Sequence, residues 1–115
     1  MDDKFHTNIK GLPEGEYVTE CMYSDAHAYK IVSKTARTVD VVGVKVKPDP
    51  EWLAKKDFQP GGFFGHTSNQ GEQTWLFDGF CEKPKRLWRN KKGKLVYKGT
   101  KFAENIATNF YDYNF

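Results

Sequence analysis

The run TVDVVGVKV, residues 38–46, favours an extended strand, because β-branched side chains dominate it and pack well on a pleated surface. The period of two divides the run into two faces, one with Val39, Val41, Gly43 and Lys45 and the other with Val42, Val44 and Val46. The preceding run AYKIVSKT (28–35) is also β-branched and aromatic, and the chain turns at TART. We therefore predict an antiparallel hairpin, in which Gly43 marks a bulge or a close backbone approach.

Other segments carry similar signals. A strand-like period of two is present in EYVTECM (16–22), and a strand is also predicted for EQTWLFDGF (72–80). A hairpin with a basic tip is predicted where KRLWRN and GKLVYKG flank the turn NKKG. Asp49 is suited to cap a helix and Pro50 to begin one, so a short helix is predicted over 50–56. TKFAENIATN is ambiguous, and FYDYNF is predicted to close the chain as an aromatic strand.

These elements predict a mostly β fold: a small antiparallel barrel or roll of about six strands, with one short helix near 50–56. The 115 residues are expected to form a single domain, 1–115, in which residues 1–15 are a polar N-terminal arm ending in a turn. Nine Phe, six Tyr and three Trp indicate a core built largely from aromatic rings.

The sequence indicates a cytoplasmic protein. No apolar run approaches the ~18 residues of a membrane span, and MDDKFHTNIK lacks the basic and apolar regions of a signal peptide. Cys21 and Cys81 lie far apart without a CxxC partner, so both are predicted to be buried free thiols.

Positive charge is concentrated in one segment. Residues 83–101 contain nine basic residues and no acidic one, whereas the remaining chain carries nine basic and 15 acidic residues, a net charge of −6. A basic strip on an acidic body indicates a polyanionic or phosphorylated partner. A solubilising hairpin is the alternative, because lysines protect exposed β-edges.

Two segments carry groups suited to ligand binding. Asp25, His27 and Tyr29 alternate at a strand entrance, where they would share one face; the alternative is an Asp–His turn with Tyr29 in the core. The loop 57–71 and its flank combine glycines, which permit close backbone approach, with rings and amides. The side chains predicted to line a pocket there are Phe64, His66, Asn69, Gln70, Gln73 and Trp75. The alternative interpretation is a structural loop whose rings cover one end of the barrel.

Signals for catalysis are weak. HTS at 66–68 matches an H-x-[ST] pattern of some phosphoesterases, but that chemistry needs two copies. The His and Cys residues have no spacing typical of a metal site, and no P-loop or nucleophile elbow is present. We therefore expect a protein that is not an enzyme and uses no cofactor or metal.

The motifs together resemble a group of small phage and prophage proteins. YSDAHAYKIVSKT, PDPEW, PGGFFGHTSNQGEQTW, LWRNKKGK and the closing FYDYNF carry this resemblance over residues 23–115. A neighbouring phage set, with W-S-D-R-H-A early and Y-Y-D-F-S-F at the end, looks like the Thoeris anti-defence sponges. The residues shared with it are Ser24-Asp25, His27-Ala28 and Tyr111-Asp112.

The resemblance implies a mostly β homo-oligomer that sequesters a cyclic ADP-ribose isomer or a cyclic oligonucleotide in the infected host's cytoplasm, without cleaving it. The aromatic C-terminal strand would form the subunit interface. The ligand-binding set is predicted to be Asp25, His27, Tyr29, Phe64, His66, Asn69, Gln70, Gln73, Trp75, Arg86, Trp88, Arg89 and Asp112.

The chain departs from the sponge pattern at its arginines. Ala26 stands where the sponges place an arginine, and Ala107-Thr108 aligns with an expected Arg-Asp pair. Any phosphate-binding arginine must come from elsewhere, and the candidates are Arg37, Arg86 and Arg89. The alternative function is a single-stranded nucleic-acid-binding module, because small β-barrels with basic hairpins and exposed rings bind single strands.

Overall fold

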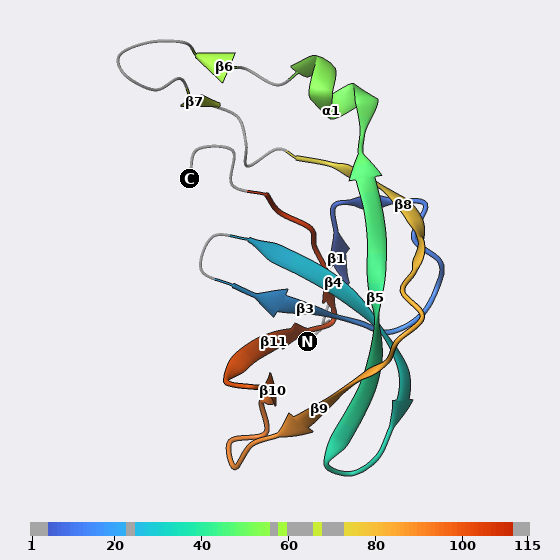
Figure 1. Cartoon of the computed structure of the whole chain (residues 1–115), viewed down its shortest axis with the longest axis vertical. Helices are drawn as coiled ribbons and strands as arrows, with labels where there is room; N and C mark the ends of the chain where they lie inside the picture. Colours follow the sequence, from blue (N-terminus) through green and yellow to red (C-terminus); the bar gives the residue numbers. More distant parts are fainter. Residues whose placement is uncertain (1–4, 23–24, 56–57, 60–65, 68–72, 112–115) are drawn as a thin grey trace.

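The computed structural model describes residues 5–22, 25–55, 58–59, 66–67 and 73–111 and has the predicted mostly β architecture (Figure 1). Six antiparallel strands form a closed barrel, since the order β5-β4-β3-β11-β10-β9 is completed by pairing of β5 with β9. These strands are β3 (Tyr17–Cys21), β4 (Ala26–Lys34), β5 (Thr38–Pro48), β9 (Lys85–Arg89), β10 (Leu95–Tyr97) and β11 (Thr100–Glu104). The predicted hairpins β4–β5 and β9–β10 are both confirmed.

Additional strands extend this barrel. β8 (Trp75–Phe80) pairs with β5, and β2 (Ile9–Lys10) pairs with β8 in parallel. The remaining strands form two small sheets, β1 (His6–Thr7) with β12 (Ile106–Ala107), and β6 (Phe58–Gln59) with β7 (His66–Thr67). The segment interpreted from sequence as an N-terminal arm therefore contributes two strands to the fold.

β5 organises the molecule because its two halves pair differently. Residues 38–41 pair with β9 and close the barrel, whereas residues 44–48 pair with β8. A register shift lies between Val44 and Val46. Gly43 accommodates a close approach, as predicted: a Cβ placed there would lie 3.0 Å from Cys81 Sγ. Side-chain crowding therefore explains why glycine stands at the point where the strand changes partner.

The two valine faces of β5 enter different hydrophobic clusters. Val39 and Val41 lie in the barrel core, and Val44 and Val46 pack against a second cluster beside β8. The barrel core comprises Val18, Val39, Val41, Leu87, Leu95 and Phe102. The second cluster comprises Ile9, Tyr17, Ala28, Trp75 and Ala107. The barrel is thus filled mainly by aliphatic side chains, and most of the core's rings lie at its margins and in the second cluster.

The predicted burial of both cysteines is wrong. Cys21 and Cys81 are exposed free thiols. Cys21 ends β3 and Cys81 directly follows β8, so each lies at the end of a strand.

Helix α1 (Pro50–Lys55) begins at the predicted cap. Asp49 Oδ1 accepts a hydrogen bond from the Glu51 backbone N–H at 3.0 Å, and Oδ2 accepts hydrogen bonds from Thr74 Oγ1 and Lys10 Nζ, both at 2.7 Å. The Asp49 carboxylate therefore joins α1, β2 and the entrance of β8. These contacts lower the Asp49 pKa from 3.8 to about 2, and the hydrogen bond from Lys10 has the largest effect.

Asp49→Asn should lower the melting temperature at neutral pH and change its response to acid. Because the folded-state pKa of Asp49 lies below its ordinary value, its contribution is present above about pH 4 and is lost as the pH falls towards 2. The difference in melting temperature between wild type and variant should therefore shrink over that range. Thermal unfolding at a series of pH values measures it. A difference that does not change with pH would contradict the assigned ion pair.

Candidate functional site

His27 and Tyr29 of the motif near the start of β4 have different hydrogen-bond partners. His27 is exposed and its Nδ1 lies 3.3 Å from Asn109 Oδ1. The Tyr29 hydroxyl instead donates to Glu20 Oε1 at 3.1 Å and accepts a hydrogen bond from Lys85 Nζ at 3.0 Å. The backbone carbonyl of Asp25 accepts a hydrogen bond from the Met22 N–H, which joins the chain after β3 to the chain before β4. Glu20, the acceptor for Tyr29, stands directly opposite His27 in the register of β3 with β4, whereas the ring nitrogen of His27 faces Asn109.

Lys85 is held between two tyrosine rings. Its Nζ lies 4.8 Å from the Tyr29 ring centroid and 4.9 Å from that of Tyr97. Burial alone would lower the Lys85 pKa, but the Tyr29 hydrogen bond and nearby negative groups, including Glu20, give a net increase. The ammonium group therefore stays charged and links β3, β4, β9 and β10 as part of the barrel wall.

A pair of side-chain amides holds the segment near the C-terminus. Asn8 Oδ1 accepts a hydrogen bond from the Asn109 N–H at 3.0 Å, and its Nδ2 donates to the Asn109 carbonyl at 2.7 Å. Gln73 binds the N–H and the carbonyl of Tyr111 in the same way. Between them, Phe110 exchanges two backbone hydrogen bonds with Ala26 of β4. The side chains of Asn8 and Gln73 thus make the backbone hydrogen bonds that a neighbouring β-strand would make in a regular sheet.

Two residues predicted to line a pocket belong to this amide arrangement. Gln73 is 3% exposed, and its Oε1 also accepts a hydrogen bond from Trp75 Nε1 at 3.2 Å. Trp75 is 9% exposed and lies in the second hydrophobic cluster. Both side chains are therefore engaged in packing and in holding Tyr111. Phe64, Asn69, Gln70 and Asp112 lie outside the described residues, as does the side chain of His66, whose backbone pairs with Gln59.

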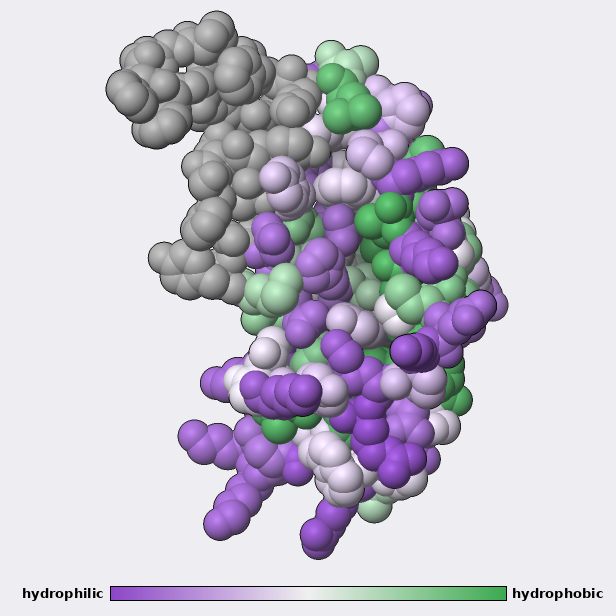
Figure 2. All heavy atoms as spheres, viewed as in Figure 1, coloured by the Kyte–Doolittle hydropathy of each residue, from purple (hydrophilic) through white to green (hydrophobic). Residues whose placement is uncertain are grey.

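The opposite end of the barrel carries the basic strip. Figure 2 shows mainly hydrophilic side chains there, over the β9–β10 hairpin and the turn between β4 and β5. A depression of about 420 Å³ lies between these two turns. It is lined by Ala36, Arg37, Arg89, Asn90, Lys91 and Gly93. Three cations and no carboxylate line it, so the depression favours an anion.

A second depression is smaller and mixed in charge. It measures about 190 Å³, and Glu16 and Glu104 line it together with Lys34. Lys34 and Glu16 form an ion pair there. Of these two depressions, the one at the basic end suits a phosphate-bearing ligand better, because cations and no carboxylates line it.

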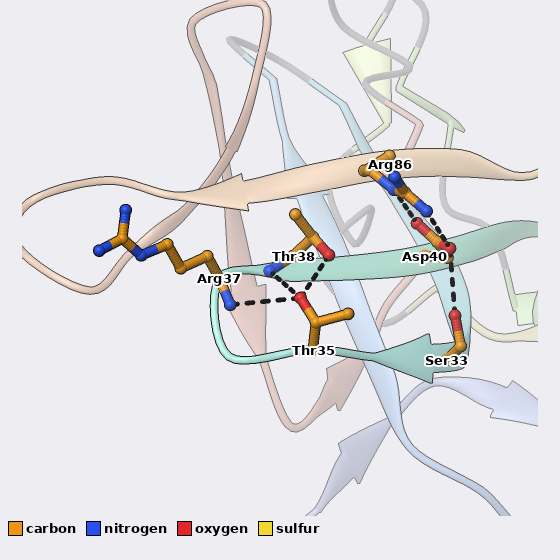
Figure 3. Close-up of polar contacts among 6 residues, drawn as sticks. All are labelled: Ser33, Thr35, Arg37, Thr38, Asp40 and Arg86. Carbon is orange, nitrogen blue, oxygen red and sulfur yellow. Dashed lines mark hydrogen bonds and ion pairs between the residues drawn. The ribbon is translucent and has the colours of Figure 1, made fainter.

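The arginines of β9 are both engaged by carboxylates. Arg86 binds Asp40 through Nε at 2.8 Å and Nη2 at 3.1 Å (Figure 3). Arg89 binds Glu104 through both terminal nitrogens and also donates to the Gly93 carbonyl at 2.9 Å. The arginine in each pair lowers the carboxyl pKa, of Asp40 and of Glu104. Both pairs connect strands of the barrel wall.

Trp88 is the large exposed ring of this basic end. Its side chain lies on β9 and is 54% exposed. Its backbone is paired with Thr38 of β5 on one side and Val96 of β10 on the other. The strand therefore presents the indole on the outer face of the barrel, opposite to the face of the neighbouring Leu87 and Arg89, and Trp88 is not among the residues that line the depression.

Within the described part of the chain, no three His, Cys, Asp or Glu residues group to bind a metal ion. None of the helices described is long and apolar enough to cross a membrane. Comparison with protein families, characterised proteins and solved structures finds no match for this chain.

The sequence predicted Arg37, Arg86 and Arg89 as candidate phosphate-binding arginines, and Arg37 and Arg89 line the depression whereas Arg86 does not. Lys91 was not singled out, because seven lysines in one segment look alike in sequence. Asn8 and Asn109 were also missed. Their hydrogen bonds join residues about a hundred positions apart, which no local pattern records.

Proposed function

We propose that this protein binds a small phosphate-bearing nucleotide and retains it without cleavage, as a phage sponge for a cyclic nucleotide immune signal. The observation that carries the proposal is the cationic depression between the β4–β5 and β9–β10 turns. Its volume of about 420 Å³ falls within the ~300–1,000 Å³ of small-molecule sites. Outside this lining, the exposed indole of Trp88 on β9 offers a stacking surface for a base.

Retention without turnover is consistent with the groups at this site. The six lining residues contribute guanidinium, ammonium, amide, methyl and backbone groups. Arginine and lysine stabilise phosphate charge, but remain protonated near neutral pH and do not serve as a general base. Such a lining suits affinity for a polyanion better than hydrolysis of one.

The proposal includes a homo-oligomer in the cytoplasm of an infected bacterium. Tyr111 is 53% exposed at the end of the described C-terminal segment, and an exposed ring there suits a subunit contact. Sedimentation velocity over a range of protein concentrations would test this part separately, and a monomer at all concentrations would remove it from the proposal.

Single-stranded nucleic acid is the second candidate ligand, and the position of Trp88 favours it. The ring is exposed among cations on a β-surface, which is how many small barrels bind single strands. Nucleic-acid binding predicts affinity that falls steeply with salt, because many phosphate contacts release counterions. A compact nucleotide contacting few cations predicts a shallower dependence.

Thermal unfolding with a ligand panel tests the proposal. The panel contains cyclic ADP-ribose isomers, cyclic di- and trinucleotides and a short oligonucleotide. A ligand at 100 times its dissociation constant should stabilise the fold by about 2.7 kcal/mol, an increase in melting temperature of roughly 10 °C. Chromatography of the heated sample should recover the ligand intact. Stabilisation by the oligonucleotide alone would favour the second candidate, and cleavage of the ligand would overturn sequestration.

A further inference from the structure

Arg37 differs from the other two arginines of the chain in the state of its guanidinium group. Arg86 and Arg89 each bind a carboxylate through two nitrogens. Arg37 makes no ion pair or side-chain hydrogen bond with any residue that the structure describes. In Figure 3 its side chain extends away from the Asp40–Arg86 pair. Its five N–H donors are therefore available to a ligand.

The backbone of Arg37 is fixed although its side chain extends freely. The Arg37 N–H donates to Thr35 Oγ1 at 3.3 Å, and the Arg37 carbonyl accepts a hydrogen bond from the Arg89 N–H at 2.9 Å. Thr35 also binds Thr38, through its Oγ1 and through its backbone N–H (Figure 3). Because the backbone is already ordered, binding has to order only the side chain of Arg37, which limits the entropic cost.

Lys91 faces the same depression from the β9–β10 turn. Asn90 Oδ1 accepts hydrogen bonds from the N–H groups of Lys92 and Lys94, and the Gly93 N–H donates to the Asn90 carbonyl. Gly93 has a φ of 81°, which favours glycine at this position. The turn therefore holds Lys91 in place, and its ammonium group forms no ion pair with the described residues.

We propose that Arg37, assisted by Lys91, binds a phosphate group of the ligand, whereas Arg86 and Arg89 stabilise the barrel wall. This assignment rests on the proposed function in that the ligand carries phosphate. A guanidinium binds phosphate through two parallel hydrogen bonds, and a lysine adds a point charge. At Arg86 and Arg89 a phosphate would compete with a carboxylate that already binds the guanidinium through two nitrogens, whereas Arg37 binds without that competition.

Two substitutions with the same change in charge test the assignment. Arg37→Gln should weaken binding of the cyclic nucleotide that stabilises the wild type by about ten- to hundredfold, because charge-assisted hydrogen bonds are lost, with little change in melting temperature. Arg86→Gln should lower the melting temperature and keep the affinity within about threefold. Isothermal titration calorimetry gives both affinities. Wild-type affinity in Arg37→Gln would overturn the role of Arg37 and leave nucleotide binding standing.

A second measurement does not depend on finding the physiological ligand. The chain has three arginines, so its ¹⁵N spectrum contains three Nε–H signals, which the corresponding lysine variants assign. Inorganic pyrophosphate should shift and protect the Arg37 signal and leave those of Arg86 and Arg89 in place. If no nucleotide binds but pyrophosphate shifts Arg37, the proposed function fails and the anion site stands. If pyrophosphate leaves Arg37 unshifted, or shifts Arg86 or Arg89 instead, the assignment fails.

Discussion

Leu87→Ala is expected to lower the free energy of unfolding by about 2–5 kcal/mol, because the side chain lies at the centre of the closed barrel. Leu87 is 0% exposed and packs in a cluster with Leu95, Val18 and Val41. β9 is held by backbone pairing on both sides, so the strand cannot easily move inward to fill the space. The substitution should therefore leave a cavity that the barrel does not fill, and the decrease in the free energy of unfolding should include both the lost contacts and that cavity.

Urea unfolding followed by circular dichroism measures this loss, with Leu53→Ala as the matched control. Leu53 lies on α1 and is 47% exposed, so the same substitution there should change stability by only about 0.5 kcal/mol. The slope of the unfolding free energy against urea should be unchanged in both variants. An equal effect of the two substitutions would contradict a barrel closed by β5 and β9.

Gln73→Ala should release Phe110 and Tyr111, while Asn8 keeps its hydrogen bonds to Asn109, and should lower the free energy of unfolding by about 2–4 kcal/mol. The substitution removes the partners of the Tyr111 N–H, the Tyr111 carbonyl and the Trp75 indole N–H. A buried polar group left unpaired costs about 1–3 kcal/mol, and release of Tyr111 to water recovers part of that cost. Phe110 should then lose its backbone pairing with Ala26, because that bridge is isolated from other strands.

Native-state hydrogen exchange at Phe110 and Tyr111 provides the measurement specific to this segment. Both amide protons are hydrogen-bonded in the folded protein and should exchange much faster in Gln73→Ala, while the amides of the barrel strands keep their relative protection. Gln73→Glu is the variant of matched size: it keeps the acceptor for the Tyr111 N–H but turns a buried carboxylate towards the Tyr111 carbonyl, so at neutral pH its effect should be at least as large as that of Gln73→Ala. Unchanged exchange at Tyr111 in Gln73→Ala would show that Gln73 does not hold the segment.

The predictable part of the fold rests on local chemistry. The alternating valines of 38–46 produced a strand, and Asp49 before Pro50 produced the predicted helix start. The turn NKKG joined the strands that flank it. Each of these features depends on backbone and side-chain preferences within a few residues, so one sequence is enough to find them.

The candidate site was less accessible from sequence, because burial and pairing join distant residues. Gln73 and Trp75 look like binding residues beside a glycine-rich loop, but the second hydrophobic cluster and Tyr111 surround them. The cysteines look like core residues and lie at exposed strand ends. The sequence gives the chemical groups of the side chains, whereas their burial depends on which strands pair and pack in the folded protein.

The sequence by itself determined that this chain makes short strands, one capped helix and a basic hairpin, because those properties follow from neighbouring residues. Only the tertiary structure decided which arginine is available to a ligand. Asp40 stands directly opposite Arg86 in the register of β5 with β9, and Glu104 reaches Arg89 from β11. Arg37 lies in a turn, outside any strand register, and therefore has no carboxylate placed opposite it. Its availability follows from the register of strands that are far apart in the chain.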